Sequence, residues 1–196
     1  NIIFDLDGTL IHTAPALAKA ANDLLKELNL PLISTDMYAT FIGGGIKKQV
    51  QRLLQHFDFS YHSIDEFVKR FKDFYYADPY FQTYLFPNVK NTLLELKSLN
   101  FNLAICTQKN RVPALKILDY FEIKEFFSGF AFGDSLNVLK PDPLMVKLAT
   151  KHLLPKKNIY IGDSNTDLKT ARNSDSTFIL FTEGYRTEDL SDLKPD

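Results

Sequence analysis

Two carboxylates stand two residues apart directly after the apolar run 2–4. The hexapeptide that begins at Asp5 reads Asp-Leu-Asp-Gly-Thr-Leu. Alternation along a strand points Asp5 and Asp7 to the same side of the backbone. Gly8 allows a close backbone approach, and Thr9 supplies a hydroxyl group. Two ionised carboxylates this close repel each other in a half-buried place, so the segment calls for a cation or a shared proton.

The elements that position this pair are predicted by hydrophobic periodicity. From residue 84 onward, short apolar runs alternate with helical stretches, which indicates a parallel sheet covered by helices on both faces. The opening run 2–4 belongs to the same sheet. The further strands are expected at 103–106, 129–132, 159–161 and 178–181, and the helices at 88–99, 110–120, 143–153 and 165–173.

The segment between these parts has a different pattern. Its apolar residues recur at helical spacing in three stretches, 17–28, 46–57 and 64–75, and no strand is predicted among them. The aromatic residues in these stretches are interpreted as the core of a helical subdomain. The sequence therefore predicts an α/β core made of 1–13 and 84–196, with a helical cap at 14–83 inserted after the first strand.

Polar residues follow each apolar run of the predicted core. Ligands of open parallel sheets bind beyond the carboxyl ends of the strands, so these residues are candidates for one shared site. They are Asp5 and Asp7 after the first strand, Thr107 and Gln108 after the second, Lys140 after the third, and Asp163 and Asp167 after the fourth.

Each candidate also has a purely structural interpretation. Thr107 alone is more typical of a helix N-cap or a turn. Lys140 alone is typical of a solvated loop lysine, and the following Pro-Asp-Pro predicts a helix start with Asp142 as N-cap. Ser164 with Asp167 fits a capping box, in which Asp167 favours the helix dipole. The conjunction of the candidates therefore carries the functional interpretation.

Together, four carboxylates and one lysine would meet at one edge of the sheet. Such a cluster repels itself unless a divalent cation is bound, and oxygen ligands without histidine or cysteine favour magnesium over zinc. Backbone amides around Gly8, the Thr107 hydroxyl and the Lys140 ammonium group could hold a phosphoryl group beside the metal. The residues thus predict a magnesium and phosphate site.

Composition excludes several other classes of protein. The chain has 196 residues, 45% of them hydrophobic, and a formal net charge of −1, which gives no electrostatic case for nucleic acid or an anionic membrane. No apolar run approaches the roughly 20 residues that span a bilayer. The single cysteine excludes a disulfide within the chain and suits a reducing compartment. We expect a cytoplasmic protein whose partner is a small molecule.

The chain resembles the haloacid dehalogenase superfamily, specifically its phosphatases with a helical cap after the first strand. Within that superfamily it is similar to phosphoglycolate phosphatases. The motifs that carry the resemblance are Asp5-Leu6-Asp7-Gly8-Thr9-Leu10, Thr107, Lys140-Pro141-Asp142-Pro143 and Gly162-Asp163-Ser164-x-x-Asp167, joined by Phe132-Gly133-Asp134-Ser135-Leu136, Thr13-Ala14-Pro15 and Gly43-Gly44-Gly45.

The resemblance implies a Rossmann-like α/β core and a role for each motif residue. Asp5 would be the nucleophile that forms an aspartyl-phosphate, and Asp7 would be the general acid and then the base. Magnesium would be bound by the Asp5 carboxylate, the Asp7 backbone carbonyl and Asp163, with Asp167 in support. Thr107 and Lys140 would bind the transferring phosphoryl group, with Gly8 and Gln108 beside them.

The resemblance also limits the reaction. Dehalogenases, phosphonate hydrolases and transporting ATPases of the superfamily lack an acid at the position of Asp7, so a phosphate ester is expected. Gln108 replaces a common asparagine, His12 an aspartate, and 174–175 an Ala-Gly pair, which leaves the substrate open. A magnesium-dependent phosphatase for a small organic phosphate is the leading hypothesis. The alternatives are a phosphosugar mutase, a pyrophosphatase or nucleotidase, and a regulatory protein without turnover.

Overall fold

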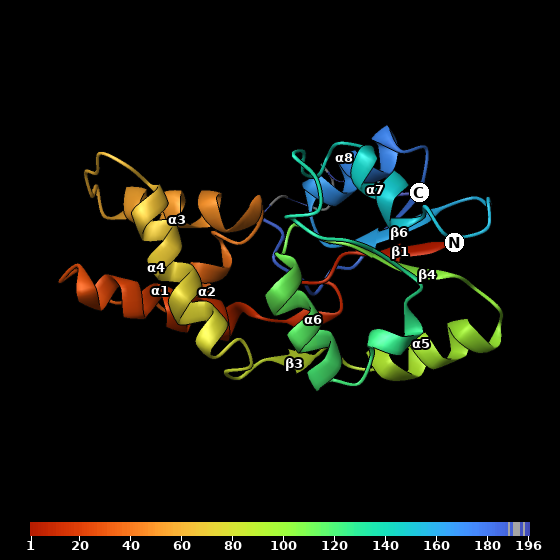
Figure 1. Cartoon of the computed structure of the whole chain (residues 1–196), viewed down its shortest axis with the longest axis horizontal. Helices are drawn as coiled ribbons and strands as arrows, with labels where there is room; N and C mark the ends of the chain where they lie inside the picture. The colour runs from red at the N-terminus through yellow and green to blue at the C-terminus, as the bar shows by residue number, and fades with distance from the viewer. Residues whose placement is uncertain (188, 190–192, 194) are drawn as a thin grey trace. The chain divides into compact units, whose positions relative to one another are not determined.

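The chain forms two compact units in the computed structural model. The first unit combines Asn1–His12 with Tyr84–Asp196, and the second is Thr13–Thr83. Figure 1 shows the elements of both units with their labels. Among the residues that the structure describes, no helix is both long and apolar enough to cross a membrane. The described residues are 1–187, 189, 193 and 195–196.

A five-stranded parallel sheet forms the centre of the first unit. Its strand order is β5-β4-β1-β6-β7, so the chain runs outward on one side of β1 and then returns to the other side. The predicted Rossmann-like α/β fold is thereby confirmed. The strands are β1 (Ile2–Phe4), β4 (Leu103–Cys106), β5 (Gly129–Ala131), β6 (Ile159–Gly162) and β7 (Thr177–Leu180).

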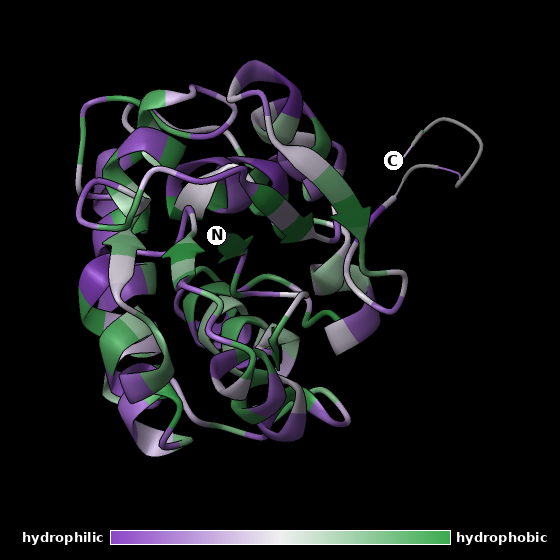
Figure 2. Ribbon diagram, turned by 90° about the vertical axis from the view of Figure 1, so that its right-hand side faces the viewer, coloured by the Kyte–Doolittle hydropathy of each residue, from purple (hydrophilic) through white to green (hydrophobic). Residues whose placement is uncertain are grey.

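The central strands are apolar because both faces of the sheet are covered. Every residue of β1 and β4 is buried, and in Figure 2 green, the colour of hydrophobic residues, covers much of the strands. In Figure 1, α7 and α8 lie on one side of the strands and α5 and α6 on the other. The elements that connect the strands are α5 (Val89–Ser98), α6 (Arg111–Tyr120), the short 3₁₀ helix η1 (Lys124–Phe126), α7 (Leu144–Ala149) and α8 (Asn165–Asn173).

Helix α7 differs from the helix expected at 143–153. Its N-cap is Pro143 rather than Asp142, whose carboxylate instead accepts a hydrogen bond from the N–H of Leu144 at 2.9 Å. The helix ends at Ala149 because the next turns close over three residues, with Lys151 N–H donating to the Leu148 carbonyl. The predicted cap was therefore wrong by one position, and the predicted helix was too long.

A second, two-stranded sheet was not predicted. Strand β2 (Ile11–His12) pairs antiparallel with β3 (Tyr84–Leu85), so Ile11 lies opposite Leu85 and His12 opposite Tyr84. Strand β2 is the last element of the first unit before the helical segment, and β3 is the first element after it. The chain thus leaves the first unit and re-enters it along one short ribbon.

The second unit is helical, and no strand lies within it. It contains one helix more than the three that periodicity predicted, the short helix α2. Buried Tyr38 of α2 donates a hydrogen bond from its hydroxyl to Gln49 Oε1 at 3.0 Å, which satisfies two polar groups inside an otherwise apolar core. The helices are α1 (Ala14–Glu27), α2 (Thr35–Ala39), α3 (Gly45–His56) and α4 (Asp65–Ala77).

Candidate active site

The candidate site lies at the carboxyl ends of the parallel strands in the first unit. The order of the strands reverses between β1 and β6, and such a switch point is where open α/β sheets bind ligands. Asp5 and Asp7 follow β1, and Asp163 follows β6. Thr107 follows β4, which is hydrogen-bonded to the other side of β1. The topology therefore brings the predicted residues to one edge.

Lys140 joins two of the predicted carboxylates. Its Nζ atom lies 2.9 Å from Asp5 Oδ1 and 2.7 Å from Asp167 Oδ1. Only 3% of the Lys140 side chain is exposed, so the ammonium group is held by these carboxylates rather than by water. The interpretation of Lys140 as a solvated loop lysine is thereby excluded.

Asp167 uses both of its oxygens inside the protein. Oδ2 accepts hydrogen bonds from the N–H and hydroxyl of Ser164, which completes the predicted capping box of α8. Oδ1 accepts from Lys140 and from the hydroxyl of Tyr160, which lies 3.3 Å away. The Tyr160 hydroxyl also lies 2.9 Å from the Cys106 carbonyl oxygen. Asp167 is thus both a helix cap and the support of Lys140.

Asp163 is enclosed by backbone on two sides. Thr9 donates its hydroxyl to Oδ1 at 3.2 Å, and the N–H of Tyr185 donates to Oδ2 at 2.6 Å. Gly8 has a φ of +85°, and a Cβ there would lie 2.4 Å from Asp163 Oδ2. A Cβ at Gly184 would lie 2.3 Å from the same oxygen. Both positions require glycine because backbone packs directly against this carboxylate.

Tyr185, in the loop after β7, also contacts the two-stranded sheet of β2 and β3. The Tyr185 hydroxyl lies 3.2 Å from Nδ1 of His12, and the His12 ring stacks on Tyr84 at a centroid distance of 4.7 Å. Tyr185 thus contacts the candidate metal ligand Asp163 through its backbone and His12 of β2 through its side chain. Its position in the loop after β7 gave no periodic signal that could have identified it.

Asp7 pairs with a lysine that the sequence analysis missed. Lys109 Nζ lies 2.9 Å from Oδ1 and 3.1 Å from Oδ2 of Asp7, and 3% of the Lys109 side chain is exposed. Lys109 immediately follows the strand-end residues Thr107 and Gln108. The rule that selected those two residues could have selected Lys109 as well.

Thr107 and Gln108 shape the backbone around the two lysines. The Thr107 hydroxyl accepts a hydrogen bond from the Lys109 N–H at 3.2 Å, which leaves the hydroxyl hydrogen to donate elsewhere. Gln108 Nε2 donates to the Lys140 carbonyl oxygen at 2.8 Å. Gln108 therefore links the segment after β4 to the segment that carries Lys140.

Burial dominates the electrostatics of the cluster. It raises the pKa of Asp5 to about 6 against the attraction of Lys140. Burial also raises the pKa of Asp163 well above its usual range, and the negative charge of Asp167 raises it further. For Lys140, burial acts to lower the pKa, but the Asp167 and Asp5 carboxylates outweigh it and keep the group charged. Burial raises the pKa of the Cys106 thiol to about 12, so this thiol is no nucleophile.

The cluster has the ligand atoms and the charge that suit a hard divalent cation. Asp5, Asp163 and Asp167 each offer a carboxylate oxygen, and these oxygens lie within 4.8 Å of one another. Asp5 Oδ1 is buried and accepts no well-aligned hydrogen bond, although Lys140 lies close to it. Among the described residues of the cluster, Asp7 makes a fourth carboxylate beside two ammonium groups, so two negative charges are in excess when every group is ionised. The residues therefore fit magnesium.

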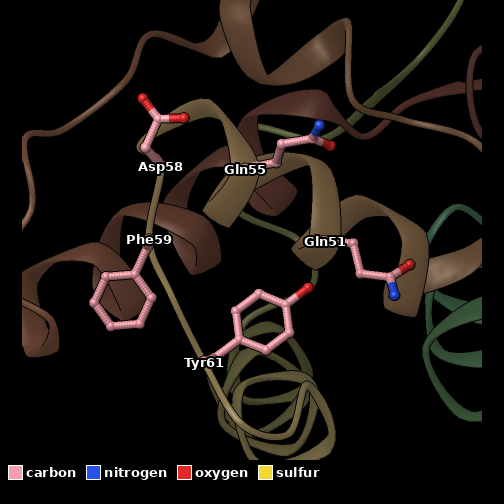
Figure 3. Close-up of a pocket in the computed structure, with 5 residues that line it drawn as sticks. All are labelled: Gln51, Gln55, Asp58, Phe59 and Tyr61. Atoms are coloured by element: carbon pink, nitrogen blue, oxygen red, sulfur yellow. The ribbon is translucent and has the colours of Figure 1, made fainter.

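A separate hollow of about 410 Å³ lies on the helical unit, on the side of α3 (Figure 3). Two glutamine amides, one carboxylate and two aromatic rings line it, and none of these groups is a cation that could hold a phosphate. This hollow therefore lacks the cationic group that the predicted phosphate site requires. The lining residues are Gln51, Gln55, Asp58, Phe59 and Tyr61.

Comparison with known proteins identifies the family of the chain. The family model described as haloacid dehalogenase-like hydrolase matches residues 2–181. Phosphoglycolate phosphatases from Cereibacter sphaeroides and Rhodobacter capsulatus are each 36% identical to the chain over 98% of its length, covering 89% and 88% of those proteins. The crystal structure of a predicted phosphoglycolate phosphatase from Haemophilus somnus superposes with a TM-score of 0.88 at 32% identity, covering 100% of this chain and 91% of that one. The predicted resemblance is confirmed, and the chain belongs to the haloacid dehalogenase-like hydrolase family.

Proposed function

We propose that this chain is a magnesium-dependent phosphatase that hydrolyses a small organic phosphate monoester, with phosphoglycolate as the first candidate, through an aspartyl-phosphate at Asp5. The observation that carries the proposal is the position of Asp5. It is a buried carboxylate at the end of the central strand, 2.9 Å from Lys140 and grouped with Asp163 and Asp167. The names of the similar phosphatases support the choice of substrate.

In the first step, a carboxylate oxygen of Asp5 attacks phosphorus. The bond from phosphorus to the ester oxygen breaks, and Asp7 gives a proton to that oxygen as the alcohol leaves. Lys140 and the Thr107 hydroxyl bind the phosphoryl oxygens while charge builds on them. This transition state requires mainly positioning and charge compensation, which the fixed lysine supplies.

In the second step, water attacks the phosphorus of the aspartyl-phosphate. Asp7, now ionised, takes a proton from the water, and the bond between phosphorus and the Asp5 oxygen breaks to release inorganic phosphate. Lys109 Nζ lies 2.9 Å from Asp7 Oδ1 and holds this carboxyl group in place. The same carboxyl group thereby serves both half-reactions.

Asp5 and Asp163 would hold the magnesium ion, together with the Asp7 backbone carbonyl. When bound, the ion supplies positive charge to the phosphoryl oxygens. Asp167 would support the site through Lys140, because both of its oxygens already accept hydrogen bonds. The buried thiol of Cys106 accords with the reducing, cytoplasmic setting that we predict.

The direct test is a panel of phosphate esters assayed for phosphate release with magnesium and with a chelator. The panel contains phosphoglycolate, sugar phosphates, nucleotides and pyrophosphate. We expect hydrolysis of phosphoglycolate that stops in the chelator. Transfer of the phosphoryl group to a second sugar hydroxyl would instead identify a mutase, and no turnover of any ester would contradict the proposal.

Magnesium should stabilise the protein more at about pH 7.5 than at about pH 5. Burial raises the pKa of Asp5 from its usual value of 3.8 to about 6. Between these two pH values, the native protein therefore binds more protons than the unfolded chain. The metal-free protein therefore loses stability as pH rises through this window. The cation meets less competition from protons over the same range.

Thermal unfolding with and without magnesium chloride at both pH values measures this effect. Asp163→Asn is the matched variant, since it removes one ligand and should abolish most of the magnesium-dependent shift in Tm. A shift that is equal at the two pH values, or unchanged in Asp163→Asn, would refute the cation site.

A further inference from the structure

Tyr160 of β6 links two strands that carry residues of the candidate site. Its side chain is fully buried, and its hydroxyl donates to the Cys106 carbonyl oxygen at 2.9 Å, at the end of β4. Strand β1 lies between β4 and β6 in the sheet, so this hydrogen bond spans the central strand. A buried tyrosine hydroxyl needs an acceptor, and here the acceptor is backbone that leads directly into the site.

The Cys106 carbonyl group belongs to the same planar peptide unit as the Thr107 N–H. That N–H donates to the Ala131 carbonyl oxygen at 2.9 Å, so hydrogen bonds hold the unit at both of its polar groups. The Thr107 side chain, whose hydroxyl would bind a phosphoryl oxygen, is attached to the next backbone atom. Tyr160 therefore fixes the backbone from which this side chain starts.

The same hydroxyl also contacts the carboxylate that holds Lys140. It lies 3.3 Å from Asp167 Oδ1, which accepts from the Lys140 ammonium group at 2.7 Å. Lys140 contacts Asp5 as well, at 2.9 Å, but in the proposed reaction the Asp5 carboxylate turns to phosphorus. Asp167 continues to hold the ammonium group, at a place that the hydroxyls of Tyr160 and Ser164 set.

We infer that Tyr160 is a positioning residue of the phosphoryl site, whose single hydroxyl sets the places of both Thr107 and Lys140. This inference rests on the proposed function and deepens it. Tyr160 acts through the Cys106 peptide on one side and through the Asp167 carboxylate on the other. The two groups that bind the phosphoryl oxygens are thereby kept in one arrangement. Charge builds on those oxygens in the transition state, so losing this order slows the reaction more than it weakens substrate binding.

Tyr160→Phe tests the inference, because it removes the hydroxyl and keeps the ring that packs 5.8 Å from the Lys140 ammonium group. We expect kcat for the fastest ester of the panel to fall about 30-fold and KM to change by less than about threefold. Orthovanadate, which imitates the five-coordinate phosphorus of the transition state, should have an inhibition constant about 10-fold higher.

The magnesium requirement separates the phosphoryl site from the metal site. The hydroxyl bonds to Cys106 and Asp167 rather than to the two carboxylates proposed to hold the ion. The magnesium concentration for half-maximal activity should therefore change by less than about threefold in Tyr160→Phe. Tyr38→Phe is the matched control, since it removes another buried hydroxyl, which donates to Gln49 in the helical unit at 3.0 Å. This control should lower Tm and leave kcat and the vanadate constant at their wild-type values.

The vanadate constant and KM are properties of the folded enzyme, so partial unfolding of a variant lowers the apparent kcat alone. A fall in kcat with an unchanged vanadate constant would therefore overturn the assignment, as would an unchanged kcat. A magnesium requirement that shifts as much as the vanadate constant would place the effect at the metal and overturn it too. In these three cases the wild type still hydrolyses its ester, and the phosphatase proposal stands. A wild-type protein that releases phosphate from no ester removes the proposed function itself.

Discussion

Asp5→Asn is expected to abolish turnover and at the same time to stabilise the metal-free protein. The amide cannot attack phosphorus, so kcat should fall on the order of 10,000-fold or more. Burial raises the pKa of Asp5 to about 6, which means that the ionised carboxylate costs the native state free energy above that pH. Neutral asparagine removes this cost, worth about 1–3 kcal/mol or a few degrees in Tm.

Activity assays with magnesium and thermal unfolding in chelator measure the two effects. Asp119→Asn is the matched control, because it removes an exposed carboxylate on α6 that pairs with the exposed Lys124 at 3.0 Å. We expect neither property to change in this control. Turnover near the wild-type level in Asp5→Asn would show that Asp5 is not the nucleophile. A lower Tm in chelator would show that its charge is well compensated without metal.

Lys140→Met is expected to damage both activity and stability. The ammonium group lies between two buried carboxylates, at 2.9 Å from Asp5 and 2.7 Å from Asp167. Its removal leaves their charges uncompensated, which costs about 3–5 kcal/mol of unfolding free energy for a buried pair. The phosphoryl group also loses a cation that neutralises it, so kcat/KM should fall on the order of 1,000-fold.

The double variant Lys140→Met/Asp167→Asn separates these two roles. Asparagine still offers an oxygen to the Ser164 N–H, but it no longer carries a buried charge. Urea unfolding should therefore show that the double variant is more stable than Lys140→Met, while its activity stays low. A double variant that is less stable than the single one would mean that the capping role of Asp167 outweighs its ion pair. Full activity in either variant would remove Lys140 from the phosphoryl site.

The sheet and most helices could be predicted from the sequence because buried faces require apolar residues at regular spacing. Strand β4 is apolar at every position because both faces of the sheet are covered. The capping box of Ser164 and Asp167 predicts the start of α8. Strands β2 and β3 could not be found this way. A two-residue strand covers a single period of alternation and shows no repeat, so its pairing is visible only in the structure.

The site residues that were missed act through contacts that hydrophobic periodicity does not reveal. Lys109 meets Asp7 across 102 positions, and its place just beyond the end of β4 was the one signal available from the sequence. Tyr160 looks like a core residue of β6, although a buried tyrosine hydroxyl requires a partner and thereby gave a signal. Tyr185 reaches Asp163 through its backbone, which no residue type reveals.

The ribbon of β2 and β3 has a consequence for how this chain can be altered. Because His12 lies opposite Tyr84, the two points at which the helical segment departs and returns are neighbours held by backbone pairing. Joining them with a tight hairpin turn would require only a few residues and would leave the ladder of the first unit continuous. The 71-residue segment from Thr13 to Thr83 is thus a removable module in topological terms. A shortened gene could be used to ask whether the α/β unit folds by itself, and other inserts could be grafted at the same point.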